Sequence, residues 1–362
     1  MAVRHLYVHL PFCSSRCGYC DFVTVVGRTD EHAGYVDALL RELELEGDLL
    51  DEHLETVYLG GGTPTLTQPR ALERLLAALP ACTELTIEAN PETVTPGLAA
   101  LLAENGVDRV SLGAQSFQPH LLRMLDRRAR PGDVRRALHA LRRAGIDNCS
   151  LDLIYGIPGQ STDDLARDVA EAVALEPEHI SAYELEAKPG TRFTHAHGAE
   201  LERQAESMER YFELVVATLR VAGYRWYETA NFCLEGGRDL RARHNLGYWL
   251  GHDYLGIGVG AVSTVDGRRW RNTPSLGRYV RAPGRPPRTV EELPAAVRQT
   301  ERLMLGLRLD RPLPLDDVGE ILDVGAAARL EQGGLLVTGD RHIALTDRGR
   351  FVGGAVTARL LA

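Results

Sequence analysis

The chain has 362 residues, of which 44% are hydrophobic and 25% are charged, and its formal net charge is −9. These values describe a folded globular protein large enough for one large domain and one small one, and they exclude fibrous and disordered classes. The negative charge argues against nonspecific binding to nucleic acid or to anionic membranes. The chain contains no apolar run of roughly 18 residues and no signal-peptide pattern after Met1, so we expect a cytoplasmic protein without a transmembrane segment.

From residue 5 to residue 222, short apolar runs rich in β-forming residues alternate with longer stretches of helical periodicity. This alternation is typical of βα units that build a parallel sheet. Six such units predict an α/β fold with an incomplete barrel rather than a closed eight-fold one. The predicted strands are His5–Leu10, Thr56–Leu59, Leu85–Ala89, Arg109–Leu112, Cys149–Ile154 and His179–Leu185. The predicted helices are Asp37–Leu50, Arg70–Leu79, Gly97–Glu104, Asp133–Ala144, Asp163–Leu175 and Glu202–Ala222.

Three cysteines follow the first predicted strand. Cys13, Cys17 and Cys20 fall at intervals of four and three, so one loop could place three thiolates around a metal centre. Three ligands on a four-iron cluster would leave one iron open, and an open metal position is where chemistry occurs. The alternatives are a zinc knuckle that lacks its fourth ligand and a chance spacing. The other cysteines have no ligand spacing and are expected to be free buried thiols: Cys82, Cys149 and Cys233.

Polar residues also follow the later predicted strands. The second strand ends in Gly60-Gly61-Gly62-Thr63-Pro64, whose glycines let a backbone approach a ligand closely. The third strand includes Glu88, a carboxylate that could hold ribose hydroxyls. Because the carboxyl ends of parallel strands form the site in α/β folds, we expect these groups to meet at one rim. Taken singly, each could be a turn, a capping residue or a surface residue. The same rim is expected to hold a polar trio, Gln115, Arg127 and Asp152.

The cysteine spacing, with Tyr19 before the third cysteine and an apolar run before the first, resembles the radical S-adenosylmethionine (SAM) superfamily. That resemblance implies a 4Fe–4S cluster whose open iron is chelated by the amino and carboxylate groups of SAM. The sequence Gly-Gly-Gly-Thr-Pro looks like the element of that superfamily that binds the SAM amino group.

Over nearly the whole chain, these blocks resemble the branch that contains oxygen-independent coproporphyrinogen III oxidase and the HemW family of haem chaperones. The oxidase has a further cysteine two residues after the third ligand, whereas this chain has Phe22 there, as in HemW. The resemblance implies that the cluster is ligated by Cys13, Cys17 and Cys20. It implies a SAM pocket lined by Tyr7, Gly61, Gly62, Thr63, Glu88, Gln115, Arg127 and Asp152.

A second block, His-Asn-Leu-Gly-Tyr-Trp, begins at His244. An imidazole beside aromatic rings could ligate haem iron, and the alternative is a packed aromatic turn with a hydrogen-bonded histidine. The HemW resemblance favours haem. The chain departs from that family at Val262 and Ala129, where relatives often have histidine. The implied haem contacts are His244, Asn245, Tyr248 and Trp249.

The segment Arg281–Arg288 contains glycine and proline and indicates a linker. The pattern beyond it predicts a small winged-helix-like α+β domain, in which acids and arginines balance, so we expect a lid or a partner-docking role and no nucleic-acid binding. Its predicted elements are helices at Leu293–Leu307, Pro314–Leu322 and Ala326–Gln332 and a hairpin at Leu335–Leu345. The predicted domains are a barrel over 1–235, an extension over 236–290 and the C-terminal domain over 291–362.

The sequence therefore predicts a protein that binds SAM and haem and delivers haem to a respiratory protein of the membrane. The alternative is a radical SAM enzyme that acts on a porphyrin or another substrate, either as a decarboxylating oxidase or as a methyltransferase. A noncatalytic metal-binding regulator is disfavoured by the cysteine and glycine motifs. Phe22 and the His244 block favour the chaperone over the oxidase, so no coproporphyrinogen oxidase activity is expected, and no catalytic residue is assigned beyond the cluster and SAM.

Overall fold

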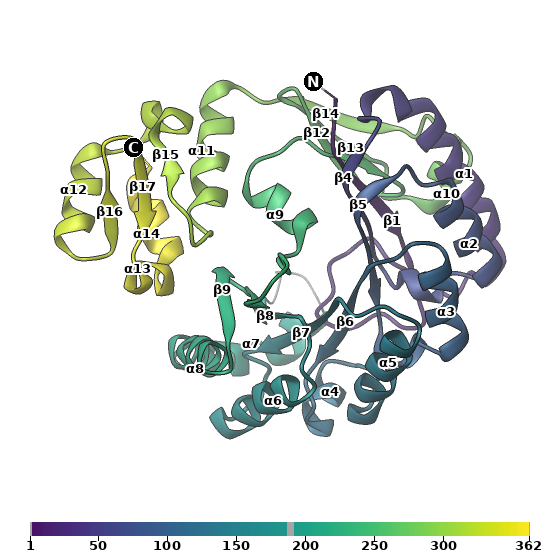
Figure 1. Ribbon diagram of the computed structural model, residues 1–362, viewed down its shortest axis with the longest axis horizontal. Coiled ribbons are helices and arrows are strands. Elements are labelled where there is room, and N and C mark those ends of the chain that lie inside the picture. The colour runs from purple at the N-terminus through teal and green to yellow at the C-terminus, as the bar shows by residue number, and fades with distance from the viewer. Residues whose placement is uncertain (1, 187–191, 362) are drawn as a thin grey trace.

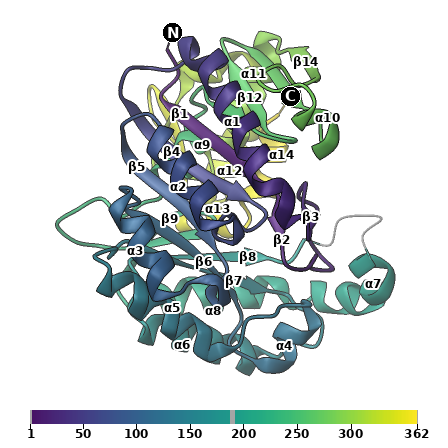
Figure 2. The ribbon, with the colours of Figure 1, turned by 90° about the vertical axis from the view of Figure 1, so that its right-hand side faces the viewer.

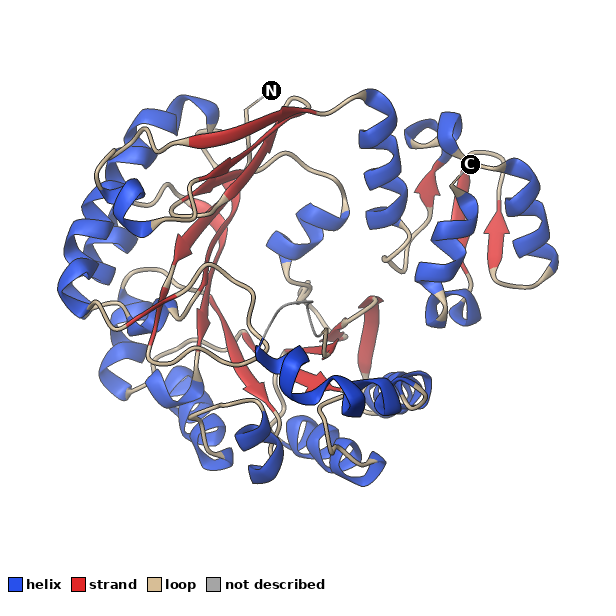
Figure 3. Ribbon diagram, turned by 180° about the vertical axis from the view of Figure 1, so that it is seen from behind, coloured by secondary structure: helices blue, strands red, loops and turns tan. Residues whose placement is uncertain are grey.

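The computed structural model describes residues 2–186 and 192–361. Its centre is a curved nine-stranded sheet with helices along its outer face (Figures 1 and 3). Across the sheet the strands are β11 (Leu255–Ile257), β1 (His5–Leu10), β4 (Leu54–Gly61), β5 (Cys82–Ala89), β6 (Arg109–Gln115), β7 (Cys149–Tyr155), β8 (His179–Glu184), β10 (Asn231–Leu234) and β9 (Tyr224–Glu228). The six strands from β1 across to β8 are parallel to one another, as predicted.

The sheet is an open partial barrel, and both of its edges extend beyond the six predicted strands. On one side β11 pairs in parallel with β1, and on the other β10 pairs antiparallel with β8 and β9. These strands have three to five residues, which is too short for a periodic pattern to be recognised. Of these, β9 and β10 form an antiparallel hairpin at one edge of the predicted parallel sheet.

A helix follows each central strand and covers the outer face of the sheet. These helices are α1 (His32–Glu46), α2 (Pro69–Ala78), α3 (Pro96–Glu104), α5 (Pro131–Arg143), α6 (Thr162–Ala174) and α8 (Met208–Val221). Ser161 begins α6 with a capping box, because its Oγ accepts from the Asp164 N–H at 3.1 Å and the Asp164 carboxylate accepts from the Ser161 N–H at 2.9 Å. A shorter helix, α4 (Pro119–Met124), precedes α5.

The single helix predicted over Glu202–Ala222 is wrong. The structure has α7 (Arg192–Ala205), then a turn at Ser207, then α8, and Figure 2 shows α7 apart from the row of helices that includes α6 and α8. Helical periodicity continues through the turn, so the pattern alone does not reveal that the chain changes direction.

Besides β11, residues 243–292 form a short helix and a second sheet beside the barrel. The helix is α9 (Arg243–Trp249), which packs against β4, and the sheet has β12 (Val262–Val265), β13 (Arg268–Asn272) and β14 (Arg288–Glu292) with α10 (Leu276–Val280) between the last two. The predicted linker ends inside this sheet. Arg288 begins β14 and its guanidinium lies 2.9 Å from the fully buried Glu42 carboxylate of α1, so this segment is anchored to the barrel.

The C-terminal part has its own hydrophobic core, which includes Leu303, Leu330 and Ile343. It consists of α11 (Ala295–Gly306), β15 (Leu313–Pro314), α12 (Val324–Gln332), β16 (Leu336–Thr338), β17 (His342–Leu345), α13 (Asp347–Phe351) and α14 (Gly353–Leu360). The predicted hairpin is confirmed as β16 and β17. The helix predicted at Pro314–Leu322 is wrong, because this segment forms two 3-10 turns, Leu315–Asp317 and Gly319–Ile321. The small α+β domain is confirmed, whereas the three domain boundaries stay predictions.

The described part of the chain includes no helix that is both long and apolar enough to cross a membrane.

Candidate functional site

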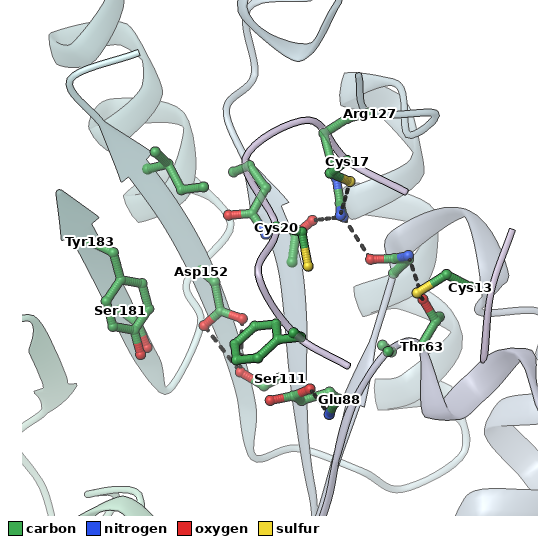
Figure 4. Close-up of a pocket in the computed structure, with 18 of the residues that line it drawn as sticks. Cys13, Cys17, Cys20, Thr63, Glu88, Ser111, Arg127, Asp152, Ser181 and Tyr183 are labelled. Atoms are coloured by element: carbon green, nitrogen blue, oxygen red, sulfur yellow. Dashed lines mark hydrogen bonds between the residues drawn. The ribbon is translucent and has the colours of Figure 1, made fainter. Parts of the chain in front are cut away.

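A cavity of about 520 Å³ opens at the carboxyl ends of the central strands (Figure 4). Its volume is typical of a small-molecule site. It brings together most of the residues predicted for the cluster and SAM, as expected for polar groups at the ends of parallel strands. Those in its lining are Cys13, Cys17, Cys20, Gly61, Gly62, Thr63, Glu88, Gln115, Arg127 and Asp152.

The cysteine loop forms one wall of this cavity. Cys13 ends the short strand β2 (Phe12–Cys13), which pairs with β3 (Val25–Val26), and the Cys20 N–H donates to the Cys17 carbonyl at 3.2 Å. All three thiols are free and partly buried. Burial raises the pKa values of the Cys13 and Cys20 thiols, so iron would have to displace their protons on binding.

The donor set fits an iron–sulfur cluster better than a single zinc ion. Sulfurs around one tetrahedral zinc would lie about 4 Å apart, since zinc–sulfur bonds are about 2.3 Å. Among the described residues, the three cysteine sulfurs do not all lie within 4.8 Å of one another. The free cysteines Cys82, Cys149 and Cys233 are absent from the described cavity lining. Three thiolates with no fourth cysteine match a cluster that keeps one iron open.

The glycine loop after β4 is shaped by the chain itself. A Cβ built on Gly62 would lie 2.6 Å from the carbonyl carbon and oxygen of Pro11, and one on Gly61, whose φ is +110°, would overlap the His9 ring. The loop N–H groups also have protein partners, because Gly62 donates to Leu10 and Thr63 donates to Phe12, both at 2.8 Å. These glycines therefore let the cysteine loop pack directly on the end of β4.

Glu88 lies in the lining of the cavity, and its carboxylate is held by two donors. The Tyr58 hydroxyl donates to Oε1 at 2.7 Å and the Gly61 N–H donates to Oε2 at 3.0 Å. Burial raises the pKa of Glu88 to about 7, and the nearby Asp152 adds to the increase. Each carboxylate oxygen has two lone pairs, so Glu88 can still accept from a ligand hydroxyl.

A chain of contacts links the first two cysteines through polar side chains from three elements. The Thr63 hydroxyl lies 3.7 Å from the Cys13 sulfur and accepts from the Asn90 amide at 3.0 Å. Arg127 donates to the Asn90 oxygen at 2.6 Å, and its other terminal nitrogen lies 3.8 Å from the Cys17 sulfur. This network places a cation beside the cysteine loop, where it would stabilise negative charge.

Gln115 and Asp152 complete the predicted rim. Gln115 has a positive φ of 64°, at the irregular end of β6, a conformation that costs free energy for a residue other than glycine and is often found at functional sites. Asp152 accepts from the Ser111 hydroxyl at 3.1 Å, and burial raises its pKa to about 6.

Tyr7 and most of the His244 block do not line the cavity. The Tyr7 hydroxyl contacts His9 Nδ1 at 3.0 Å, so a contact between Tyr7 and SAM stays a prediction. Among the four predicted haem contacts, the described lining includes Asn245 alone, and His244, Tyr248 and Trp249 lie outside it.

His244 is buried and both of its ring nitrogens have partners. Nδ1 lies 2.7 Å from Thr56 Oγ1, and Nε2 lies 3.1 Å from the Tyr248 hydroxyl. Burial lowers its pKa to about 3. In this arrangement His244 does not fit as an axial ligand of haem, and the packed, hydrogen-bonded histidine is the alternative that the geometry matches.

Sequence reasoning missed two residues that organise the cavity. Tyr58 holds Glu88 and stacks on the His244 ring with centroids 4.9 Å apart, which connects the cavity to α9. Asn90 bridges Thr63 and Arg127. Tyr58 is two residues before Gly60 on β4 and Asn90 is two residues after Glu88, so the two-residue period of a strand was a usable signal.

Comparisons with known proteins agree with this geometry. The family model of the radical SAM superfamily matches residues 7–172, and that of the HemN C-terminal domain matches residues 293–352. Heme chaperone HemW of Mycobacterium tuberculosis (strain ATCC 25618 / H37Rv) is 39% identical over 374 residues, which cover 98% of this chain and 94% of that protein. Heme chaperone HemW of Bacillus subtilis (strain 168) is 30% identical over 383 residues, with 99% of each chain covered.

A solved structure of coproporphyrinogen III oxidase (HemN) from Escherichia coli, described as a radical SAM enzyme, superposes with a TM-score of 0.83. It is 22% identical and covers 99% of this chain and 90% of that one, so it shows a shared fold. The family-model match over residues 7–172, together with this fold and cavity, defines a protein of the radical SAM class. Within that class, the chain belongs to the HemW family.

Proposed function

We propose that this protein is a haem chaperone that holds a 4Fe–4S cluster on Cys13, Cys17 and Cys20 and binds SAM in the adjoining cavity. The observation that supports this most is the convergence of three free thiols, the glycine loop and Glu88 on one cavity, in a chain whose full length matches HemW proteins. The cluster would supply the open iron for SAM and a single electron.

The residues around the cluster would bind and orient SAM. Glu88 would accept from the ribose hydroxyls, and its own contacts to Tyr58 and Gly61 would keep the carboxylate in place. Arg127, through Asn90 and Thr63, would fix the cysteine loop and balance negative charge near Cys17. Asp152 and Gln115 would complete the polar wall.

We further propose that the chain binds haem and passes it to a respiratory protein of the membrane, and that it acts in the cytoplasm, where thiols stay reduced. Haem ligation by His244 would require α9 to shift, because both imidazole nitrogens already have partners. Tyr58 supports communication between the two sites, since it contacts Glu88 and stacks on His244.

The test is a haem titration of anaerobic protein with a reconstituted cluster, followed by addition of SAM. We expect a saturable Soret band in the wild type, retention of that band in Cys17→Ala, and an altered ligation spectrum in His244→Ala. Haem-loaded protein should then lose haem to vesicles that contain a haem-depleted respiratory protein.

Product analysis separates this proposal from the enzymatic alternative. SAM cleavage accompanied by a modified porphyrin, with no saturable haem binding, would contradict the chaperone role. That result would make a porphyrin-modifying enzyme or a methyltransferase the correct assignment.

A further inference from the structure

Three side chains with metal-ligand chemistry converge at the amino-terminal ends of β1 and β4, outside the described lining of the cavity. His5 Nε2 lies 3.0 Å from His252 Nδ1 and 3.2 Å from Glu55 Oε2. One such atom from each residue lies within 4.8 Å of the other two. His5 is on β1, Glu55 is on β4 and His252 follows α9, so the cluster joins three separate elements.

Hydrogen bonding alone does not satisfy this arrangement. His5 Nε2 has at most one hydrogen, yet it makes short contacts with two other atoms that can accept. If His252 donates to His5 instead, the contact between His5 and Glu55 has no hydrogen. In the second case two lone pairs face each other at 3.2 Å, and in the first a single hydrogen is shared between two acceptors. A cation between the three atoms would relieve either arrangement.

The surroundings of His5 match those of a metal ligand. Its other ring nitrogen, Nδ1, lies 2.9 Å from the Thr56 hydroxyl, and that hydroxyl lies 2.7 Å from His244 Nδ1. If His5 donates to Thr56 and Thr56 donates to His244, the lone pair of His5 Nε2 points at Glu55 and His252. A second hydrogen bond that fixes the tautomer is typical of metal-bound histidines.

We propose that His5, Glu55 and His252 form a binding site for a divalent transition metal, with Zn²⁺ as the expected ion. Two imidazoles and one carboxylate suit zinc, whereas calcium and magnesium prefer oxygen ligands and copper(I) prefers sulfur. Ligand atoms about 2 Å from a tetrahedral zinc are about 3.3 Å apart, close to the two distances from His5. His252 is exposed, so the fourth position would be open to water.

The site would tie the end of α9 to the first two parallel strands. Arg4 lies 3.4 Å from Glu55 Oε1, which leaves Oε2 for the metal. Because Thr56 contacts both His5 and His244, metal binding would also fix the hydrogen-bond direction at the His244 block. The role is therefore structural or regulatory, and none of the three ligands is a cluster cysteine or lies in the described lining of the cavity.

The experiment measures zinc on full-length protein by competition with a chromophoric chelator and by elemental analysis. Two backgrounds are compared, cluster-loaded protein and a variant with Cys13, Cys17 and Cys20 all changed to Ser, since zinc can bind the cysteine loop. We expect one zinc ion per chain in both. His252→Ala and Glu55→Gln should each weaken zinc binding more than tenfold, and Thr56→Val should weaken it by about 10- to 100-fold through the lost hydrogen bond.

His53→Ala is the matched control. His53 is an exposed histidine two residues before Glu55, and its ring contacts Thr83 and none of the three proposed ligands. This variant should leave zinc affinity unchanged, and circular dichroism should show that every variant is folded. Equal zinc affinity in wild type, His252→Ala and Glu55→Gln would overturn the proposal. So would the absence of zinc from the protein that lacks the three cysteines.

Discussion

Cys17 has a cation as its neighbour, and this sets the electrostatics of the cysteine loop. Arg127 is half enclosed by Asn90, the Gly113 carbonyl and the Cys17 sulfur. A partly buried guanidinium that is held in place by neutral acceptors keeps its charge available for a nearby anion. An iron–sulfur cluster with thiolate ligands is such an anion, so the loop and Arg127 form one unit.

Changing Cys17 to Ala should abolish the cluster, because water replaces a thiolate corner poorly. Iron and acid-labile sulfide analysis of anaerobically reconstituted protein measures the loss. Cys82→Ala is the control and should retain full iron loading, since Cys82 is partly buried and lies outside the cavity. An unchanged cluster spectrum in Cys17→Ala would refute the assignment of ligands.

Glu88 should make both stability and SAM binding depend on pH. Burial raises its pKa from 4.5 to about 7, so between these values the folded protein holds a proton that the unfolded chain releases. The folded state therefore loses stability as pH rises through this window. Binding of ribose hydroxyls needs the carboxylate, so SAM affinity should increase over the same range.

Calorimetry at about pH 6 and about pH 8, on either side of the raised pKa, measures this effect. Glu88→Gln should remove the pH dependence and weaken binding at the higher pH by about 1–3 kcal/mol, as expected for a lost hydrogen bond to a charged group. Asp152, whose pKa is raised to about 6, is the neighbouring titratable group. If the pH dependence of SAM affinity survives in Glu88→Gln and disappears in Asp152→Asn, Asp152 is the group whose ionisation controls SAM binding.

At the scale of the elements, the glycine loop has a role in packing that the sequence did not reveal. The motif predicted that backbone approaches a ligand closely, which stays a prediction; in the structure, Gly62 makes its close contact with the Pro11 backbone of the neighbouring strand end. The contact joins segments about fifty residues apart in sequence, and no periodic pattern encodes such a pair.

Gly62→Ala should therefore destabilise the folded protein, whatever its effect on SAM affinity. The added Cβ would lie 2.6 Å from the Pro11 carbonyl, so the cysteine loop has to move, at a cost of about 1–3 kcal/mol. Thermal unfolding and iron loading should both decline. Gly97→Ala in α3 is the control, because no atom lies within 4 Å of the added methyl group, and its midpoint should stay the same or rise. Equal thermal midpoints in Gly62→Ala and the wild type would show that the loop accommodates the added methyl group without strain.

The central strands and the rim residues were predictable because each depends on local patterns. Every predicted strand lies in the sheet, since each contains a short run rich in apolar and β-forming residues. The strands β9 to β14 were not predicted, because each has only three to five residues and a periodic pattern cannot be recognised over so few. The Asp266-Gly267 turn between β12 and β13 was a usable hairpin signal. β13 contains three arginines and is still the middle strand of its sheet. The burial and hydrogen bonding of His244 could not be predicted from its own block, because its Nδ1 contacts Thr56 on β4.

For the whole molecule, the junction between barrel and C-terminal domain includes a buried carboxylate. Glu228, at the end of β9, is fully buried, and its Oε1 lies 2.6 Å from Arg308 Nε. Next to this pair, the Asp310 N–H donates to the Tyr227 carbonyl at 3.0 Å. The C-terminal domain thus covers part of the β9 edge, which protects an otherwise unpaired strand.

Arg308→Ala should destabilise the full chain by about 1–3 kcal/mol, because Glu228 keeps its contacts to Ala230 and Asn231 but loses its cation. Denaturant unfolding measures the shift in midpoint. Arg341→Ala removes a pair in which both side chains are exposed, so its effect should be within about 1 kcal/mol. Equal shifts in the two variants would show that the junction does not depend on the Glu228 pair.

The charge of the cavity bears on which substrates the whole protein can accept. Its described lining has more acids than bases. The carboxylates are Asp21, Glu88, Glu92, Asp126, Asp152, Glu184 and Glu186, and the guanidiniums are Arg16, Arg109, Arg127 and Arg128. Arg109 and Arg127 already donate to protein acceptors. A ligand with several carboxylates would therefore meet a surplus of negative charge.

We expect that this protein does not convert coproporphyrinogen III to protoporphyrinogen IX, even with an intact cluster, SAM and a reductant. Hydrogen abstraction needs the substrate carbon to be held in an attack-ready geometry beside the SAM-derived radical. A tetracarboxylate could be held there only with paired cations, because carboxylates left unpaired on leaving water are costly. Phe22 is 62% exposed and lines the cavity two residues after Cys20, so this part of the lining is an apolar ring that cannot pair with a carboxylate. Chromatography of an anaerobic assay with coproporphyrinogen III measures the outcome, and SAM cleavage should be slow and uncoupled from decarboxylation. Protoporphyrin formed in step with 5′-deoxyadenosine would show instead that the cavity orients the tetracarboxylate despite its charge and that the protein is an oxidase.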